Sequence, residues 1–235
     1  MIRFRRGDTC LWLPPDAETL PGVAGSPAIL FLHGVGERGL GGAALDLVAR
    51  WGLAKLRLRQ TPPWGAPQPF LVVAPQCPPD HFWGHLEVAD GVDALLDELT
   101  AAGEADPGRL CLAGFSMGGI GAYDLALRWP DRFAVLVSVC GACEQPWRLA
   151  ELAHLPQWVA WADDDEIARL TIGSREIVAR LSPFGRLVAR SYRVGPEGGI
   201  GAHPRTADAA FAEPDLHRWL IEHLVGREAG LPHPG

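Results

Sequence analysis

A serine flanked by glycines is the residue of this chain best suited to covalent chemistry. Ser116 lies between Gly114 and Gly118. The segment 114–118 directly follows the apolar run 110–113, and a helical pattern begins at once after Ser116. A Gly-x-Ser-x-Gly turn between a strand and a helix strains the backbone of the serine and lifts its hydroxyl clear of the sheet. The helix N-terminus beside the serine also favours negative charge. The segment therefore predicts a serine nucleophile.

A serine hydroxyl near pH 7 needs a base that takes its proton and an acid that orients the base. His203 is the best candidate for the base, because it ends the glycine-rich segment 198–203 and lies between the last predicted strand and the last predicted helix. The remaining late histidines fit worse, since they fall before the acid-bearing strand, in the C-terminal helix or in the tail: His154, His217, His223 and His233. We expect His203 in a flexible loop.

The acid is expected among three adjacent aspartates, Asp163, Asp164 and Asp165, which follow the predicted strand 157–161. Neighbouring carboxylates repel one another, so a purely structural purpose for such a triplet at a strand end is hard to see. The alternative is a solvated loop in which Asp165 or Glu166 caps the next helix. The residues alone leave the choice among the three aspartates open.

Attack on a carbonyl also produces an oxyanion, which needs N–H donors. The backbone of Met117, directly after the serine, supplies the first donor. We expect the second from the loop His-Gly-Val-Gly-Glu-Arg-Gly at 33–39, whose glycines let the backbone approach closely. Val35 is the preferred donor and Gly36 the alternative. His33 is given a structural role, because it lies within this loop.

The elements that position these residues alternate between short apolar strands and amphipathic helices. The predicted strands cover 28–32, 70–74, 109–115, 133–139, 157–161 and 187–194. The predicted helices cover 43–58, 86–102, 117–129, 166–181 and 208–224. This alternation predicts an α/β fold with a mostly parallel central sheet and helices on both faces. The candidate residues all follow strands, so they should meet at the carboxyl ends of the strands.

The length of 235 residues suits one domain over 1–235, with a core at about 5–226 and a flexible tail at 227–235. A net charge of −7 without a basic patch argues against nucleic acid as a partner. We expect neither a membrane span nor a secretory leader, and hence a cytoplasmic location. The five cysteines are not expected to form a disulfide framework. No cofactor and no metal are predicted, since His81 and His85 lack a carboxylate partner in sequence.

Taken together, the motifs resemble the α/β-hydrolase superfamily, and more closely its small prolyl-oligopeptidase-like and phospholipase/carboxylesterase-type esterases. The similar stretches are Leu-Phe-Leu-His-Gly-Val-Gly-Glu-Arg-Gly at 30–39, Ala-Pro-Gln-Cys-Pro at 74–78, Gly-Phe-Ser-Met-Gly-Gly at 114–119 and Trp-Pro-Asp-Arg-Phe at 129–133. This resemblance implies a serine hydrolase that works through an acyl-enzyme. It favours Asp165 as the acid, although the His-Gly and Val-Pro that usually surround this aspartate are replaced here.

The substrate is expected to be a small or medium carboxylic ester. Only residues 141–156 separate two predicted strands where related enzymes carry a lid, so we expect an open site without a sizeable cap domain. Trp83, Trp161 and Trp147 are the predicted substrate-binding residues. The alternatives are a small peptidase or amidase with the same triad, and a non-catalytic binding protein with this fold. The sequence predicts no oligomeric state.

Overall fold

A seven-stranded sheet forms the centre of the molecule in the computed structural model, which describes residues 2–16, 25–65 and 67–226. The strands are β1 (Cys10–Leu13), β2 (Ser26–Leu32), β3 (Leu71–Pro75), β4 (Ala105–Phe115), β5 (Val135–Val139), β6 (Gln157–Ala162) and β7 (Leu187–Tyr192). Their order across the sheet is β1-β3-β2-β4-β5-β6-β7. β1 pairs antiparallel with β3, and the other neighbours run parallel.

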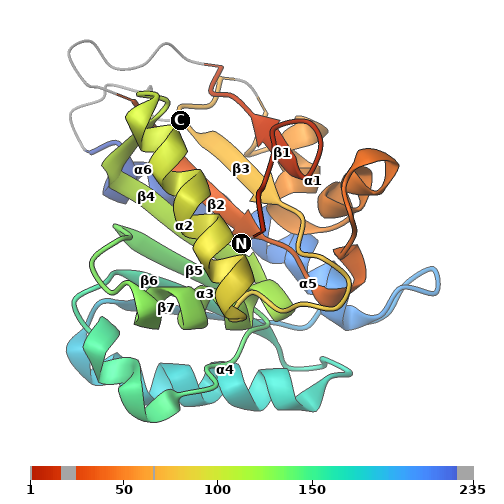
Figure 1. The fold of residues 1–235 in the computed structure, drawn as a ribbon. Helices are drawn as coiled ribbons and strands as arrows, with labels where there is room; N and C mark the ends of the chain where they lie inside the picture. Colours follow the sequence, from red (N-terminus) through yellow and green to blue (C-terminus); the bar gives the residue numbers. More distant parts are fainter. Residues whose placement is uncertain (1, 17–24, 66, 227–235) are drawn as a thin grey trace.

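Helices cover both faces of this sheet (Figure 1). The α-helices are α1 (Gly52–Leu58), α2 (Leu86–Ala101), α3 (Met117–Arg128), α4 (Ala168–Leu181), α5 (Ala202–Phe211) and α6 (Pro214–Leu224). The apolar faces of α2, α3 and α4 pack on one side, and those of α1, α5 and α6 on the other. Because both faces are buried, the central strands carry mostly apolar residues rather than an alternating pattern.

The main differences from the predicted elements are one additional strand and two helices that are divided. β1 is an additional edge strand. The predicted helix 43–58 is two elements, the 3-10 helix η2 (Gly42–Ala49) and α1, because the chain is extended at Trp51 and Gly52 has a φ of 69°. The predicted helix 208–224 is also two, since α5 begins earlier and Pro214, which has no N–H to donate, starts α6.

Close contacts of the backbone explain the two glycines that flank Ser116. A Cβ atom on Gly114 would lie 2.1 Å from the carbonyl oxygen of Gly118. A Cβ atom on Gly118 would lie 1.9 Å from the carbonyl oxygen of Leu32. Side chains at either position would therefore push α3 away from β2 and β4. The turn after β4 needs both glycines for space, although neither has a positive φ.

The connection between β5 and β6 is too short for a cap domain. Between β5 and β6 the structure has the 3-10 helix η3 (Pro146–Leu152), which is seven residues long. The site above this edge is therefore uncapped among the described residues. The predicted tail, 227–235, lies outside them.

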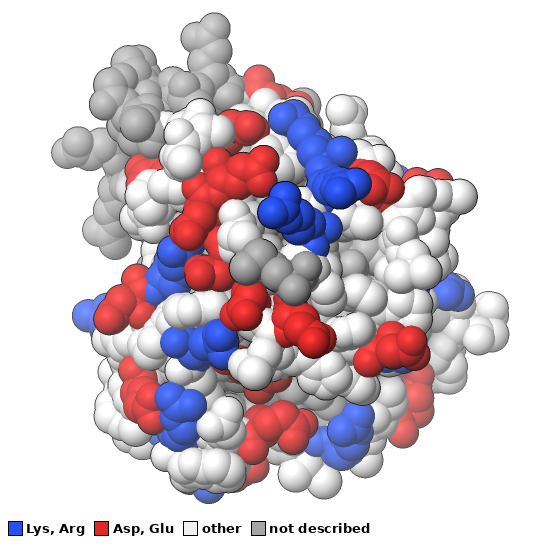
Figure 2. Space-filling model, viewed as in Figure 1, with Lys and Arg blue, Asp and Glu red and all other residues white. Residues whose placement is uncertain are grey.

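Two further predictions concern a basic surface patch and a membrane span, neither of which was expected. On the face seen in Figure 2, which carries α2, acidic and basic side chains are interspersed. Over the residues that the structure describes, no helix combines the length and the apolar character needed to cross a bilayer.

Candidate active site

Ser116 occupies a strained position between β4 and α3. Its φ is 58° and its ψ is −117°, a conformation that residues with a side chain rarely adopt. The backbone N–H of Ser116 donates to the carbonyl oxygen of Val139 at 2.9 Å, which ties the turn to the end of β5. The side chain lines an open cavity, and the first turn of α3 directs free N–H groups toward it. Strain of this kind is typical of functional residues.

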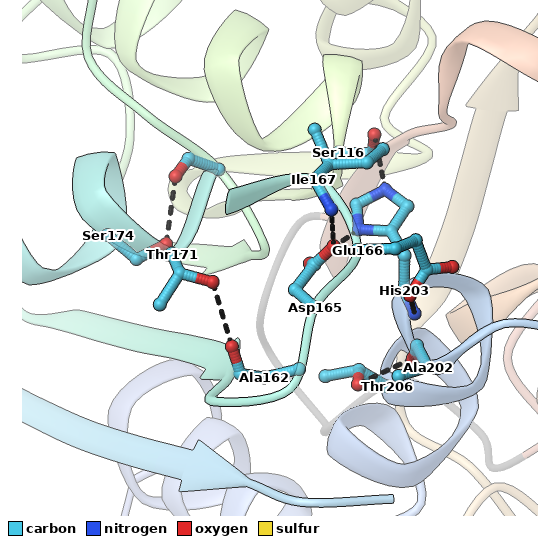
Figure 3. Close-up of polar contacts among 11 residues, drawn as sticks. Ser116, Ala162, Asp165, Glu166, Ile167, Thr171, Ser174, Ala202, His203 and Thr206 are labelled. Atoms are coloured by element: carbon cyan, nitrogen blue, oxygen red, sulfur yellow. Dashed lines mark hydrogen bonds and ion pairs between the residues drawn. The ribbon is translucent and has the colours of Figure 1, made fainter. Parts of the chain in front are cut away.

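His203 lies next to Ser116, although it comes 87 residues later in the chain. Its Nε2 atom is 2.8 Å from the Ser116 Oγ atom (Figure 3). The predicted location in a flexible loop is wrong, because His203 is the second residue of α5 and is buried. A helix can begin here because Gly201 serves as the N-cap residue and Pro204 falls in the first turn, where its missing N–H costs no hydrogen bond.

Asp165 is the aspartate of the triplet that reaches His203. Its Oδ2 atom is 2.7 Å from His203 Nδ1, and its Oδ1 atom accepts the backbone N–H of Ile167 at 2.7 Å. An ionised carboxylate only accepts, so Nδ1 donates to Asp165 and Nε2 of the neutral ring is left to accept the serine hydroxyl proton. The arrangement orients the imidazole for proton transfer from Ser116.

The other two aspartates have different partners. Asp163 accepts from Trp161 Nε1 at 2.9 Å and from Arg175 at 2.7 Å, and these bonds lower the pKa of its carboxyl. Asp164 accepts the backbone N–H of Gly195 at 2.8 Å, which holds the glycine-rich loop before α5. The structure therefore separates the triplet into one aspartate at the histidine and two that order the surrounding loops.

Glu166 supports the same histidine through its backbone. The Glu166 Oε2 atom accepts the N–H of His203 at 3.1 Å (Figure 3). This carboxylate thus satisfies an N–H group in the first turn of α5, where an acidic side chain also interacts favourably with the helix dipole. A side chain at Gly201 would collide with Glu166, since a Cβ atom there would lie 1.8 Å from Oε1.

The predicted N–H donors for an oxyanion come from the residue after Ser116 and from the loop after β2. Met117 is the first residue of α3, where the backbone N–H has no partner within the helix. Val35 and Gly36 begin the 3-10 helix η1 (Val35–Glu37) and line the cavity beside Ser116. Because β2 and β4 are adjacent and parallel, the loop after β2 lies next to the turn after β4. The structure brings these backbone groups together with Ser116 and His203.

A buried glutamine in the segment 74–78 holds this loop. Gln76 Nε2 donates to the carbonyl oxygens of Glu37 at 3.0 Å and Ala44 at 2.6 Å, and Gln76 Oε1 accepts the N–H of Gly41 at 2.9 Å. A Cβ atom on Gly39 would lie 2.5 Å from the Gln76 amide, so glycine is required there. Gln76 was not among the predicted site residues, although the motif that contains it was recognised.

Replacing Gln76 with alanine is expected to impair both folding stability and catalysis. The change removes the hydrogen-bond partner of the Gly41 N–H and of two carbonyl groups, and it should cost about 2–4 kcal/mol in the free energy of unfolding. It should also lower kcat/KM of the folded protein, because the loop that carries Val35 loses its anchor. Urea denaturation and ester hydrolysis measure the two effects.

Gln68→Ala is the matched control, since Gln68 is a buried glutamine that bonds to Pro63 and Gly65. It should lower stability with little change in kcat/KM. Equal losses of kcat/KM in both variants would contradict the anchoring role.

His33 is confined inside the same loop and has the structural surroundings expected of it. The His33 Nε2 atom accepts the N–H of Cys77 at 2.9 Å, and its Nδ1 atom lies 2.7 Å from the carbonyl oxygen of Gly34. Trp83 Nε1 donates to the carbonyl oxygen of His33 at 3.1 Å. Burial lowers the pKa of His33 from 6.5 to about 4. The ring is therefore neutral at pH 7, and moving it out of the loop would break its hydrogen bond to Cys77.

The neutral state of His33 predicts a loss of stability in mild acid. Between pH 6.5 and 4 the unfolded chain takes up a proton at His33 that the folded chain does not, so the free energy of unfolding falls as the pH falls. The full effect is about 3 kcal/mol. Urea denaturation at pH 7 and at pH 4.5 measures it, and His33→Gln should reduce the difference between the two. A difference that is unchanged in His33→Gln would contradict this assignment.

The cavity beside Ser116 has a volume of about 340 Å³ and mostly apolar walls. Its larger side chains come from Val35, Trp51, Phe115, Ile167 and Ile200. Glu37 and Arg50 supply charged groups. Sequence reasoning missed Trp51 because the predicted helix 43–58 placed it inside a regular element.

The three predicted tryptophans do not line this cavity. Trp83 is 0% exposed and packs in the core against His33, with its indole N–H already bonded. Trp161 is half-buried and bonds to Asp163, and Trp147 is 71% exposed on η3. Trp83 and Trp161 were expected in loops at strand ends, but Trp161 lies within β6. The side chains of Trp83 and Trp161 are held by the core and by the acid loop.

Cys140 forms a group of possible metal ligands with Asp165 and His203. Its Sγ atom and ligand atoms of Asp165 and His203 lie within 4.8 Å of one another. Burial raises the pKa of the Cys140 thiol, which disfavours the thiolate that metals bind. Asp165 and His203 are moreover bonded to each other. The donor set therefore fits a hydrogen-bonded triad better than a metal centre.

Part of the chain is similar in sequence to proteins described as putative esterases. Residues 66–175 match the family described as "Putative esterase". The protein named "Putative esterase NocK", from Nocardia uniformis subsp. tsuyamanensis, is 35% identical over 138 residues, which are 56% of this chain and 37% of that protein. The chain thus spans little more than a third of the length of this curated relative.

Solved structures extend the likeness to nearly the whole chain. A thermostable esterase has a TM-score of 0.71 at 24% identity, covering 91% of this chain and 58% of that one. A Mycobacterium tuberculosis puromycin-hydrolyzing peptidase has a TM-score of 0.65 at 17% identity, covering 94% of this chain and 39% of that one. Esterase PE8 has a TM-score of 0.60 at 20% identity, covering 93% and 100%. The predicted α/β-hydrolase fold is confirmed.

Proposed function

We propose that this chain, which has the α/β-hydrolase fold and resembles the esterases of that superfamily, is a serine hydrolase that cleaves carboxylic esters. The observation that carries the proposal is the chain of hydrogen bonds from Ser116 through His203 to Asp165. Ser116 Oγ is 2.8 Å from His203 Nε2, and His203 Nδ1 is 2.7 Å from Asp165 Oδ2. Ser116 lies in the turn between β4 and α3, Asp165 in the loop after β6, and His203 in the first turn of α5. Hydrogen bonds in this order activate a serine for attack.

The reaction begins with attack of Ser116 Oγ on the ester carbonyl carbon, while His203 Nε2 takes the hydroxyl proton. Asp165 stabilises the imidazolium that forms, and the N–H groups of Met117 and Val35 (or Gly36) hold the oxyanion. The tetrahedral intermediate then expels the alcohol, which leaves with the proton from His203. Water attacks the acyl-enzyme with His203 again as base, and the second tetrahedral intermediate releases the carboxylic acid as His203 returns the proton to Ser116 Oγ.

The size of the cavity supports acyl groups of small or medium length. A volume of about 340 Å³ lies at the lower end of the range of small-molecule pockets. Its walls at Trp51, Phe115 and Ile200 are apolar, which suits an acyl chain. The peptidase alternative uses the same triad and is distinguished by comparing matched esters and amides.

Fluorophosphonate labelling tests the proposed nucleophile. Wild-type protein should gain the mass of one adduct in intact mass spectrometry, and Ser116→Ala should gain none. Hydrolysis of p-nitrophenyl esters with acyl chains of rising length then gives the acyl preference. Absence of an adduct on folded wild-type protein would refute the serine hydrolase and favour the non-catalytic alternative.

A further inference from the structure

The side chain of Glu37 is a buried acid in the cavity that the reaction does not use. Glu37 ends η1, is 4% exposed, and lines the cavity beside Ser116. Its Oε2 atom is enclosed and has no hydrogen-bond partner among the described residues. A buried carboxyl oxygen without such a partner is unusual, because the lost hydration is normally replaced by hydrogen bonds.

Glu37 lies close to the reacting groups. It follows the proposed oxyanion donor Val35 by two residues. A Cβ atom on Gly34 would lie 2.8 Å from Glu37 Oε2 and 3.4 Å from the ring of Phe115, so the carboxyl and this ring flank the same backbone. Phe115 in turn packs on the imidazole of His203, with ring centroids 4.8 Å apart. When the N–H group of Val35 binds the substrate carbonyl, the Glu37 carboxyl therefore lies near the groups attached to the carbonyl carbon.

Burial is the largest influence on the electrostatics of the Glu37 carboxyl. Burial raises the pKa of its carboxyl, and the Gly34 backbone, Arg50 and His203 offset this only in part. Arg50 is exposed at the cavity and forms no ion pair within the described part of the chain. A donor supplied by a ligand would relieve the desolvation of this carboxyl.

We propose that Glu37 is a specificity residue that accepts a hydrogen bond from an N–H or O–H group on the acyl part of the substrate. The preferred substrates are then esters of 2-hydroxy or 2-amino acids rather than of plain fatty acids. This inference rests on the proposed ester hydrolysis. The rival role for Glu37 is purely structural, with the carboxyl reaching back to the start of η1 as in a capping box.

Three ethyl esters of the same chain length test the preference: ethyl butyrate, ethyl (S)-2-hydroxybutyrate and ethyl (S)-2-aminobutyrate. Wild-type protein should hydrolyse at least one of the two donor-bearing esters with a kcat/KM about 10- to 100-fold above that of ethyl butyrate. The readout is this ratio, so a general loss of activity does not imitate the effect. The ester with the larger ratio identifies a hydroxyl or an ammonium group as the donor.

Variants of Glu37 assign the preference to its carboxyl. Glu37→Ala should bring both ratios close to one. Glu37→Gln keeps the shape and an acceptor oxygen but no charge, so it should reduce the ratio for the amino ester more than that for the hydroxy ester. Asp46→Asn, which neutralises an exposed carboxylate on the neighbouring η2, should leave both ratios unchanged.

The outcomes separate failure of this inference from failure of the proposed function. Fluorophosphonate labelling with equal hydrolysis of all three esters by wild-type protein would overturn the role of Glu37 while the serine hydrolase stands. Unchanged ratios in Glu37→Ala and Glu37→Gln would overturn it as well and favour the structural role. A wild-type protein that neither labels nor hydrolyses any ester would remove the basis of both proposals. The wild-type ratios decide the matter even where a variant fails to fold.

Discussion

Ser116→Ala is expected to lower kcat for ester hydrolysis by about 10⁴- to 10⁶-fold while the protein stays folded. The change removes the oxygen that attacks the carbonyl, so no acyl-enzyme forms. His203 and the N–H donors remain and give only the residual rate of an oriented water. Since Ser116 is held at a φ of 58°, a smaller side chain does not remove the backbone strain, and the melting temperature should change little.

Steady-state kinetics and thermal unfolding check this expectation together. Ser182→Ala is the matched control, because Ser182 is an exposed serine whose hydroxyl bonds to the carbonyl oxygen of Val178 at the end of α4. It should leave kcat unchanged. A Ser116→Ala protein that retains more than about a tenth of the wild-type kcat would contradict a serine nucleophile, because removal of such a residue costs far more.

Most of the sheet could be predicted because its central strands are buried on both faces. Runs such as Ala28–Leu32 and Phe70–Ala74 are apolar at every position, which distinguishes them from half-buried strands. β1 escaped prediction, since it has four residues and depends on pairing with β3, some 60 residues away. Edge strands of this kind are fixed by tertiary pairing rather than by their own pattern.

The candidate site, like the sheet, could be predicted from the sequence only in part. The elbow at Ser116 has a local steric signature, so its backbone could be predicted. The helical position of His203 could not, because Gly201 and Pro204 are typical of loops and equally compatible with a helix start. The walls of the cavity were also missed, since Trp51 and Ile200 come from segments that meet only after folding. The absence of a cofactor and the cytoplasmic location stay predictions.

Neutralising Asp165 should discriminate among the three aspartates more sharply than the sequence does. Asp165→Asn is expected to lower kcat by about 10³- to 10⁴-fold. An asparagine amide donates to Nδ1 and so moves the ring proton of His203 to Nε2. The nitrogen 2.8 Å from Ser116 Oγ then carries a proton and cannot accept the one from the hydroxyl.

Asp163→Asn and Asp164→Asn provide matched controls within the same loop. Asp163 bonds to Arg175 and Asp164 to the N–H of Gly195, so their loss should change kcat by less than about 10-fold, the effect of altered loop order rather than of a lost triad member. Measurement of kcat for all three variants with one p-nitrophenyl ester decides between them. A larger loss in Asp164→Asn than in Asp165→Asn would mean that the acid loop rearranges when substrate binds. Because Asp165 is fixed from two sides, by the N–H of Ile167 and by His203, we expect the loop to keep its conformation and Asp165 to carry the effect.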